Sequence, residues 1–503
     1  MRALVASEPP PPCPDGFNLA AHVLREAERL ADKTALAVLR PGGAERWSYG
    51  RLAGAVRGVA TGLLQAGLEP GDRLMMRLDN GVAFPLAFLG AVSAGIVPVP
   101  TPAALTAPEV ARLVDLVRPA AIVASPGAAV PSPAPCPVLP AADLVAFERL
   151  PPAGFRPGAP DRLAYIVFTS GSSGRPRAVA HAHRAIWARR MMREGWTGIG
   201  ETDRVLHTGA LNWTYTLGTG LLDPWAAGAT AMVTAPDVAP AQLPLLMRRF
   251  DVTIIAGVPG IYRRLLRLDP WPALPRLRHG LSAGEQLPPA LRAAWRARTG
   301  TDLHEALGMS ECSTFISSSP ARPAPPGTTG HAQPGRRIAV LDADGRPVAR
   351  GEPGLLAVAG DDPGLFLGTF GPDGITPPAG DWFVTGDVVV MEEDGAIRYL
   401  GRNDDMLNAG GFRLSPAEIE AALLAHPGVA ECAAVEVRPR PDTSLIAAFY
   451  TGSADRAALA AHAETCLAPY KRPRILERRA ALPHNANGKV DRRKLREEWK
   501  ESP

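Results

Sequence analysis

Residues 168–179 read FTSGSSGRPRAV, and they continue an apolar run at 163–168, LAYIVF. The apolar run predicts a buried strand, and the small residues after it predict a loop. Glycines let a backbone approach an anion, while hydroxyls and the guanidinium groups of Arg175 and Arg177 can bind phosphate oxygens. No Gly-Lys-Ser/Thr stands at the Walker spacing, so the stretch indicates a nucleotide-phosphate loop outside the P-loop class, or else a flexible Gly/Ser surface loop. The residues of this loop are Thr169, Ser170, Gly171, Ser172, Ser173 and Gly174.

The composition is that of a globular protein. The chain has 503 residues, of which 46% are hydrophobic and 21% charged, which allows a large core and more than one domain and excludes disordered and fibrous classes. The net charge of +4 comes from 54 basic and 50 acidic residues, so nothing indicates nucleic-acid binding. Five cysteines without a CxxC pair predict neither a disulfide framework nor a zinc site, and with no secretory signal we expect a cytoplasmic protein.

One uncharged segment, residues 80–108, resembles a membrane span by hydropathy alone. Prolines and glycines interrupt it repeatedly, however, and a proline inside a helix breaks the backbone hydrogen bonding. We therefore expect a buried helix followed by a short buried strand at 96–99, and no membrane span.

Helical and strand patterns alternate along the chain, which predicts an α/β fold built on mainly parallel sheets. The character changes near residues 401–405. Ser415 starts a helix with capping-box spacing and a proline at the first helical position, and strand-like runs follow at 430–437 and 445–450. We expect a large N-terminal domain of layered α/β subdomains at 1–402 and a small, mobile α+β domain at 403–503.

Five further segments follow the loop in a fixed order. They read LSAGEQLP at 281–288, LGMSE at 307–311, WFVTGD at 382–387, GRNDDMLNAGGFRLSP at 401–416 and LPHNANGK at 482–489. Together with the TSGSSGxPR loop, this set resembles the adenylate-forming superfamily of acyl-CoA synthetases, carrier-protein adenylation domains and luciferases. The resemblance extends from about residue 47 to residue 495, and the segment at 211–229 is similar in layout to the benzoate–CoA ligases.

The resemblance implies a functional role for several charged residues. Each of them, taken alone, would be explained as an ordinary turn, surface or helix-start residue. Asp387 and Arg402 would bind the ribose, although alone they would be a turn aspartate and a surface arginine. Glu311 would hold Mg²⁺, which favours one or two carboxylates plus phosphate oxygens, whereas a lone Ser-Glu pair usually starts a helix. Arg177 would bind phosphate and assist catalysis. Further nucleotide contacts are implied for Gly284, Glu285, Glu305, Ala306, Leu307 and Ser310.

Lys489 is the strongest catalytic candidate, although a lysine in a basic tail can also be one more solvated charge. In the family this lysine reaches the substrate carboxylate and the α-phosphate, where it would stabilise growing negative charge. Asp404 corresponds to the hinge at which the small domain rotates, which would withdraw the lysine and bring Gly410, Gly411 and Phe412 to the pantetheine tunnel. Lys489 would also be a possible target of a lysine acyltransferase, because acylation removes its charge.

The resemblance implies a two-step ligase that uses ATP, Mg²⁺ and coenzyme A. A carboxylic acid would form an acyl-adenylate and pyrophosphate, and a thiol would then displace AMP. Two alternatives are an enzyme that loads a carrier-protein phosphopantetheine, since that subfamily shares the motifs, and a nucleotide-binding protein without chemistry.

The expected acyl pocket consists of Asn212, Trp213, Gly218, Ala283 and Gly308. Acetate-specific relatives carry tryptophan where this chain has Gly308, so we expect an acid larger than acetate, of apolar, aromatic, alicyclic or medium-chain character. Two positions depart from the family pattern. Arg177 stands where lysine is usual, and Leu307 replaces the common tyrosine beside the adenine.

Overall fold

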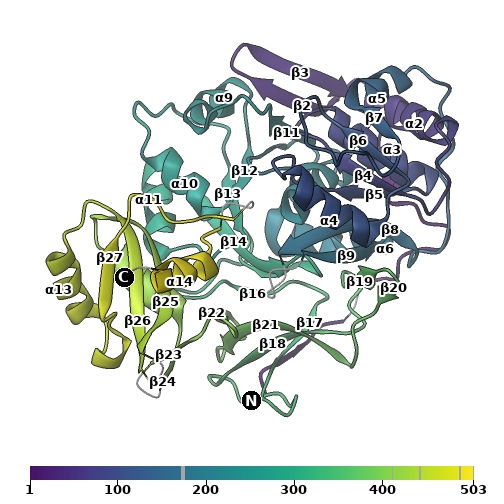
Figure 1. The fold of residues 1–503 in the computed structure, drawn as a ribbon. Helices are drawn as coiled ribbons and strands as arrows, with labels where there is room; N and C mark the ends of the chain where they lie inside the picture. Colours follow the sequence, from purple (N-terminus) through teal and green to yellow (C-terminus); the bar gives the residue numbers. More distant parts are fainter. Residues whose placement is uncertain (9, 171–175, 410–411, 441–442, 486–488, 502–503) are drawn as a thin grey trace.

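The computed structural model describes residues 1–8, 10–170, 176–409, 412–440, 443–485 and 489–501. Figure 1 shows an α/β molecule in which a smaller C-terminal part, drawn in yellow, packs beside a larger N-terminal part. This agrees with the expected fold class. The helices of the N-terminal part are α1 (Leu19–Val23), α2 (Tyr49–Gln65), α3 (Ala83–Ala94), α4 (Ala107–Val117), α5 (Ala141–Phe147), α6 (Arg184–Ala188), α7 (Arg190–Met192), α8 (Asp223–Ala226), α9 (Leu243–Arg249), α10 (Pro259–Leu266) and α11 (Pro289–Thr299), with π-helices η1 (Arg193–Thr197) and η2 (Thr216–Leu222).

A nine-stranded sheet forms the centre of the N-terminal part, in the order β16-β15-β14-β13-β12-β10-β11-β2-β3. Six of its strands run parallel, from β14 through β13, β12, β10 and β11 to β2, so their carboxyl ends share one edge. The strands are β2 (Thr34–Arg40), β3 (Gly43–Ser48), β10 (Arg204–His207), β11 (Thr230–Thr234), β12 (Ile254–Gly257), β13 (His279–Ala283), β14 (Asp302–Met309), β15 (Ser313–Ser317) and β16 (His331–Ala332). Ligand sites of parallel sheets lie at such an edge.

A parallel sheet of four strands accounts for the uncharged segment. Its order is β5-β4-β6-β7, with β4 at Arg73–Arg77, β5 at Val97–Pro100, β6 at Ala121–Ala124 and β7 at Val138–Pro140. Helix α3 and strand β5 occupy the segment, as expected, and nearly every residue of α3 is buried. Within the described residues, no helix is both long and apolar enough to cross a membrane.

Two antiparallel sheets carry residues of the expected site. The first, in the order β20-β19-β9-β8, contains β8 (Leu163–Ser170), β9 (Pro176–Ala182), β19 (Gly368–Gly371) and β20 (Gly374–Thr376). Strand β8 confirms the buried strand expected before the phosphate loop. The second, in the order β1-β17-β18-β21-β22, contains β1 (Leu4–Ala6), β17 (Arg337–Leu341), β18 (Pro353–Ala359), β21 (Trp382–Met391) and β22 (Ile397–Arg402).

The C-terminal part is an α+β module with its own buried clusters. Ser415 caps helix α12 by accepting a hydrogen bond from the Glu418 amide, as the capping-box spacing predicted. Two short strands precede it and a three-stranded sheet, β25-β26-β27, follows. The elements are β23 (Leu407–Ala409), β24 (Phe412–Leu414), α12 (Pro416–Leu424), β25 (Val429–Arg440), β26 (Thr443–Gly452), α13 (Arg456–Cys466), β27 (Ile475–Arg478) and α14 (Arg492–Glu501).

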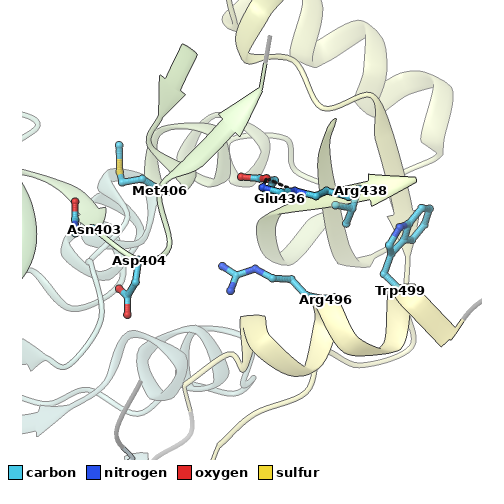
Figure 2. Close-up of a pocket in the computed structure, with 8 residues that line it drawn as sticks. Asn403, Asp404, Met406, Glu436, Arg438, Arg496 and Trp499 are labelled. Carbon is cyan, nitrogen blue, oxygen red and sulfur yellow. Dashed lines mark hydrogen bonds and ion pairs between the residues drawn. The ribbon is translucent and has the colours of Figure 1, made fainter. Parts of the chain in front are cut away.

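A pocket of about 330 Å³ lies between the start of this module and its last helix. Figure 2 shows Asp404 and Met406 on one side of it and Arg438 and Trp499 on the other. The segment that joins the two parts of the chain therefore faces open space.

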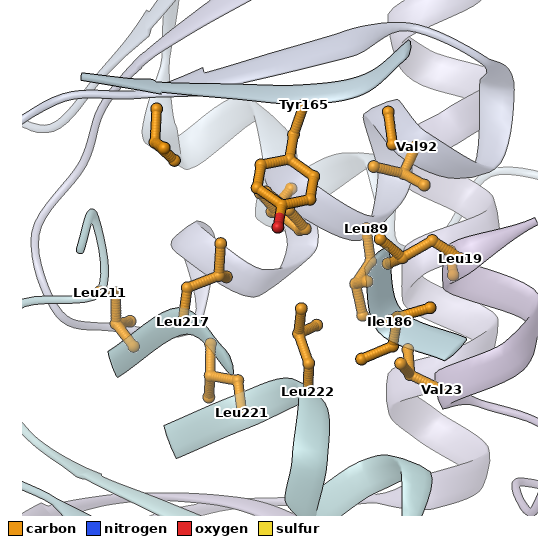
Figure 3. Close-up of a cluster of buried hydrophobic side chains, with 14 of the residues drawn as sticks. Leu19, Val23, Leu89, Val92, Tyr165, Ile186, Leu211, Leu217, Leu221 and Leu222 are labelled. Atoms are coloured by element: carbon orange, nitrogen blue, oxygen red, sulfur yellow. The ribbon is translucent and has the colours of Figure 1, made fainter. Parts of the chain in front are cut away.

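In the main core, strand β8, which precedes the phosphate loop, packs against helix α3 and the π-helix η2. Figure 3 shows Tyr165 of β8 among leucines of α3 and η2. Fully burying one leucine stabilises a fold by about 1.5–3 kcal/mol, so a continuous cluster of this kind holds its elements in fixed positions. Residues labelled in the cluster are Leu19, Val23, Leu89, Val92, Ile186, Leu211, Leu217, Leu221 and Leu222.

Candidate active site

Two turns at the carboxyl edge of the central sheet carry expected site residues. Gly284 and Glu285 follow β13, and Gly284 adopts a left-handed φ of +94°, which glycine tolerates. Ser310 and Glu311 lie in the turn between the paired strands β14 and β15. Because β13 and β14 are adjacent and parallel, their register brings the two turns together.

Glu311 is 7% exposed, and burial raises the pKa of its carboxyl although Arg177 and Arg402 lower it. The carboxylate forms no ion pair with a described residue, so it remains available to a cation. A single carboxylate beside phosphate oxygens is a donor set that suits Mg²⁺. Among the described residues no group of three or more His, Cys, Asp or Glu could bind a metal by itself.

Arg177 lies at the beginning of β9, the strand that follows the phosphate loop. The β8–β9 hairpin pairs it with Thr169, and its guanidinium donates a hydrogen bond to Thr369 Oγ1 at 3.3 Å. Its positive charge also acts on Glu311. Gly171, Ser172, Ser173 and Gly174 lie outside the described residues, as does Arg175.

Asp387 and Arg402 face one another across strands β21 and β22. Arg402 Nη1 lies 3.3 Å from Asp387 Oδ1 and donates to the Thr385 carbonyl at 2.7 Å. Burial raises the pKa of Asp387, while Arg402 and Lys489 lower it. A Cβ atom on Gly386 would lie 2.8 Å from Arg402 Nη2, so glycine is needed for the guanidinium to come this close.

Lys489 comes from the C-terminal module but lines a pocket of the N-terminal part. Its Nζ lies 5.7 Å from the centroid of a Trp213 ring, and its backbone is held by Asn485, whose Oδ1 accepts from the Lys489 amide at 3.1 Å. Burial lowers the pKa of the half-buried amine, although Glu285 and Asp387 raise it. The ammonium therefore interacts electrostatically with Glu285 in the first turn and with the Asp387–Arg402 pair.

This pocket, about 70 Å³, contains three of the five expected acyl-pocket residues, namely Trp213, Ala283 and Gly308. Asn212 and Gly218 are outside its lining, although Gly218 packs against one lining residue, Arg189. Sequence reasoning did not name the other lining residues. Some lie in the quoted segments 211–229 and 307–311, but which side chains face the pocket depends on the fold. The other lining residues are Arg189, Met192, Thr214, Tyr215, Thr219, Met309, Ser313 and Thr314.

Gly308 is explained by backbone packing as well as by pocket size. A Cβ atom there would lie 2.4 Å from the Ser313 carbonyl oxygen and 2.5 Å from the Thr314 Cα. The register of β14 and β15 shifts between Leu307 and Gly308, which brings the backbones together at this point. A glycine at 308 is therefore required by the hairpin itself.

Glu305 makes structural contacts, and its expected nucleotide contact stays a prediction. Its carboxylate accepts a hydrogen bond from the Leu287 amide at 2.8 Å and lies 3.4 Å from Arg292. Burial raises the pKa of this carboxyl to about 7. Ala306 belongs to the cluster that contains Tyr215, and Leu307 packs against the main core.

Asp404 lies beside the ribose-site candidates, with its carboxylate 3.5 Å from Arg402 Nε. The next residue, Asp405, accepts from Arg496 of α14 at 2.7 Å, which fixes the end of the connecting turn to the C-terminal module. Gly410 and Gly411 lie outside the described residues, and Phe412 begins β24 opposite Ala409.

Comparison with known proteins places this geometry in context. The AMP-binding enzyme family profile matches residues 23–369, and the AMP-binding enzyme C-terminal domain profile matches residues 418–489. The benzoate–CoA ligase of Thauera aromatica is 32% identical over 461 residues, covering 86% of each chain. A solved anthranilate CoA ligase in complex with anthranoyl-AMP has a TM-score of 0.88 at 25% identity, covering 97% of this chain and 98% of that one. A benzoate CoA ligase from Burkholderia xenovorans LB400 has a TM-score of 0.85 at 28% identity, covering 95% and 100% respectively.

Proposed function

The chain belongs to the AMP-binding enzyme family, and on that basis we propose that it is an AMP-forming acyl-CoA synthetase that activates an aromatic carboxylic acid. The reaction consumes ATP and coenzyme A and requires Mg²⁺. Relatives named as benzoate and anthranilate CoA ligases support the acid class.

The position of Lys489 is the observation that carries this proposal. A lysine from the C-terminal module lines the same pocket as Trp213 and Gly284 of the N-terminal part, and it interacts electrostatically with Asp387. An ammonium in that place suits a reaction in which a carboxylate approaches a phosphate, because two anions must come together.

In the first step, a carboxylate oxygen of the acid attacks the α-phosphorus of ATP, the bond to the bridging oxygen breaks and pyrophosphate leaves. Lys489 stabilises the charge that grows on the oxygens around phosphorus. Asp387 accepts hydrogen bonds from the ribose hydroxyls, and Arg402 orients the Asp387 carboxylate. Arg177 offsets the negative charge of the phosphates. Glu311 would hold Mg²⁺, which neutralises phosphate charge when bound.

In the second step, the sulfur of coenzyme A attacks the acyl carbon, the bond to the AMP oxygen breaks and the thiol proton passes to water. Rotation of the small domain (403–503) about Asp404 withdraws Lys489 and brings the segment of Gly410, Gly411 and Phe412 to the thiol. The turn at Asp404 borders an open pocket, which supports movement there.

A carrier-protein thiol is the second candidate acceptor, because the adenylation chemistry is the same. The relatives named above are coenzyme A ligases, which favours coenzyme A. Acylation of Lys489 by an acyltransferase would stop the first step by removing the positive charge, and intact-mass analysis with an activity assay tests this. A cytoplasmic location is also proposed, and cell fractionation tests it.

The test of the function is a panel of benzoate, hydroxybenzoates, hexanoate, cyclohexanecarboxylate and acetate with ATP, Mg²⁺ and coenzyme A. We expect aromatic acyl-CoA with one AMP and one pyrophosphate per thioester. Efficient turnover of acetate without the aromatic acids would contradict the acid class, and ADP formation would contradict the reaction class.

A further inference from the structure

Arg189 is a charged side chain on the wall of the Lys489 pocket, although it is only 7% exposed. It forms a two-pronged ion pair with Asp223 of α8, from Nε to Oδ1 and from Nη2 to Oδ2, both at 2.6 Å. Two hydroxyls accept further hydrogen bonds from it. Nη1 donates to Ser313 Oγ at 2.8 Å, and Nη2 donates to Thr219 Oγ1 at 3.2 Å.

The hydrogen bonds of this guanidinium can be counted. An arginine has five N–H donors, and the contacts with Asp223, Ser313 and Thr219 use four of them. The described residues supply no acceptor for the second N–H of Nη1. A buried donor without a partner is costly, so an acceptor that enters the pocket and takes this hydrogen is favoured.

The surrounding backbone is shaped to admit the guanidinium. A Cβ atom on Gly218 would lie 2.2 Å from Arg189 Cζ, so only glycine leaves room for it in η2. Ser313 adopts a left-handed φ of +58°, which is unusual for a residue other than glycine. Arg189 is therefore held in one place by groups from α8, η2 and β15.

The charge of the cluster restricts what it can bind. Arg189 and Asp223 neutralise each other, so a second carboxylate on the substrate would bring a buried negative charge without a counter-ion of its own. A neutral acceptor has no such cost. The other walls include Trp213 and Tyr215, whose ring centroids are 5.3 Å apart at 88°, and such walls suit a flat aromatic ring.

We propose that the substrate is an aromatic acid with a neutral hydrogen-bond acceptor on its ring, such as a phenolic hydroxyl, and that Arg189 Nη1 donates to that acceptor. This rests on the proposed function, and it narrows the expected range of apolar, aromatic, alicyclic or medium-chain acids to an aromatic acid with a polar ring substituent. Arg189 acts as a specificity residue, since it binds the far part of the acid while Lys489 serves the carboxylate.

The test compares benzoate with its 3- and 4-hydroxy and 3- and 4-methyl derivatives, isophthalate and terephthalate. Methyl and hydroxyl groups are similar in size, so the methyl acids control for pocket filling. Dissociation constants come from calorimetry and kcat/KM from thioester formation. We expect one hydroxy acid to be favoured over its methyl counterpart about 10- to 100-fold in both quantities, as befits a hydrogen bond to a charged group.

Variants at Arg189 test whether this residue causes the preference for the hydroxy acid. In Arg189→Met/Asp223→Leu, which removes both charges together, the hydroxyl-to-methyl ratio should fall to about one. Arg189→Lys keeps the charge but loses the planar fork, so it should lower the ratio too and provides a second route if the double variant does not fold. Arg278→Lys is the matched control, because Arg278 makes the same two-pronged contact with Asp203 outside the pocket.

Equal binding of hydroxy and methyl acids, tightest binding of a dicarboxylate, or an unchanged ratio in both Arg189 variants would overturn the inference. Thioester formation without a hydroxyl preference would overturn it and leave the proposed function intact. A hydroxyl preference in calorimetry with no thioester from any acid would support the inference and overturn the proposed function.

Discussion

Single residues in this site are determined by close packing as much as by chemistry. Gly386, with φ +80°, lets Arg402 reach Asp387, and Gly308 lets two strands meet. Both stand in segments that the sequence resemblance had identified, but their steric reasons depend on backbone register, which a motif does not specify. The ion pair of Arg189 and Asp223 was not predicted from the sequence, since 34 positions separate the partners and Arg189 lies outside every segment that carried the resemblance.

Gly386→Ala should weaken ATP binding. The added methyl displaces the Arg402 guanidinium from Asp387, and losing that contact should raise the KM for ATP about 10-fold while the KM for the acid changes little. Gly395→Ala is the matched control, because Gly395 has a similar φ of +84° but open space around its Cβ position. Equal effects of the two substitutions on the KM for ATP would show that backbone strain alone is responsible.

Glu305→Gln should change how stability depends on pH. Folding raises the pKa of Glu305 from 4.5 to about 7, so its stabilising contribution is complete below pH 4.5 and is lost as the pH rises through 7. Relative to the glutamine variant, the wild type should lose on the order of 3 kcal/mol of unfolding free energy between pH 4.5 and 8. Urea unfolding of both proteins at several pH values measures this, and parallel pH profiles would refute the shift.

At the scale of elements, the sequence predicted the type and position of individual helices and strands better than the way the strands pair. The strand before the phosphate loop, the helix and strand at 80–108 and the capped helix α12 are confirmed, because periodicity, prolines and caps act locally. The pairing of β21 with β22, which sets Asp387 opposite Arg402, depends on contacts between distant segments and was not predicted; the resemblance implied only that both residues bind the ribose. The π-helix η2 gave no sequence signal.

Asp404→Pro should separate the two half-reactions. Proline fixes φ in the connecting turn, so rotation of the small domain should be restricted and the thiol step slowed more than adenylate formation. Asp404→Ala is the control, because it removes the same carboxylate and its contact with Arg402 without restricting the backbone. Single-turnover measurements of both steps give the comparison, and a proline variant with a normal thiol step would exclude Asp404 as the hinge.

The whole molecule has two parts that meet at the reacting pocket. Arg263 of α10 lies 4.0 Å from Glu285 and 3.9 Å from Glu431 of the C-terminal module, so charged contacts join the parts next to Lys489. The resemblance predicted both the family and the two-part architecture, and the comparisons confirm them. The domain boundary between residues 402 and 403 and the hinge at Asp404 stay predictions.

The most direct test of the account compares wild type, Lys489→Ala and Lys494→Ala in the two half-reactions separately. With benzoate, ATP and Mg²⁺, we expect Lys489→Ala to lose about 10²–10³ in the rate of adenylate formation, as removal of a charge-stabilising donor does. The exposed Lys494 controls for loss of a nearby charge. From supplied benzoyl-adenylate and coenzyme A, all three proteins should form thioester at similar rates. Equal loss in both half-reactions, or normal adenylate formation by Lys489→Ala, would contradict the account.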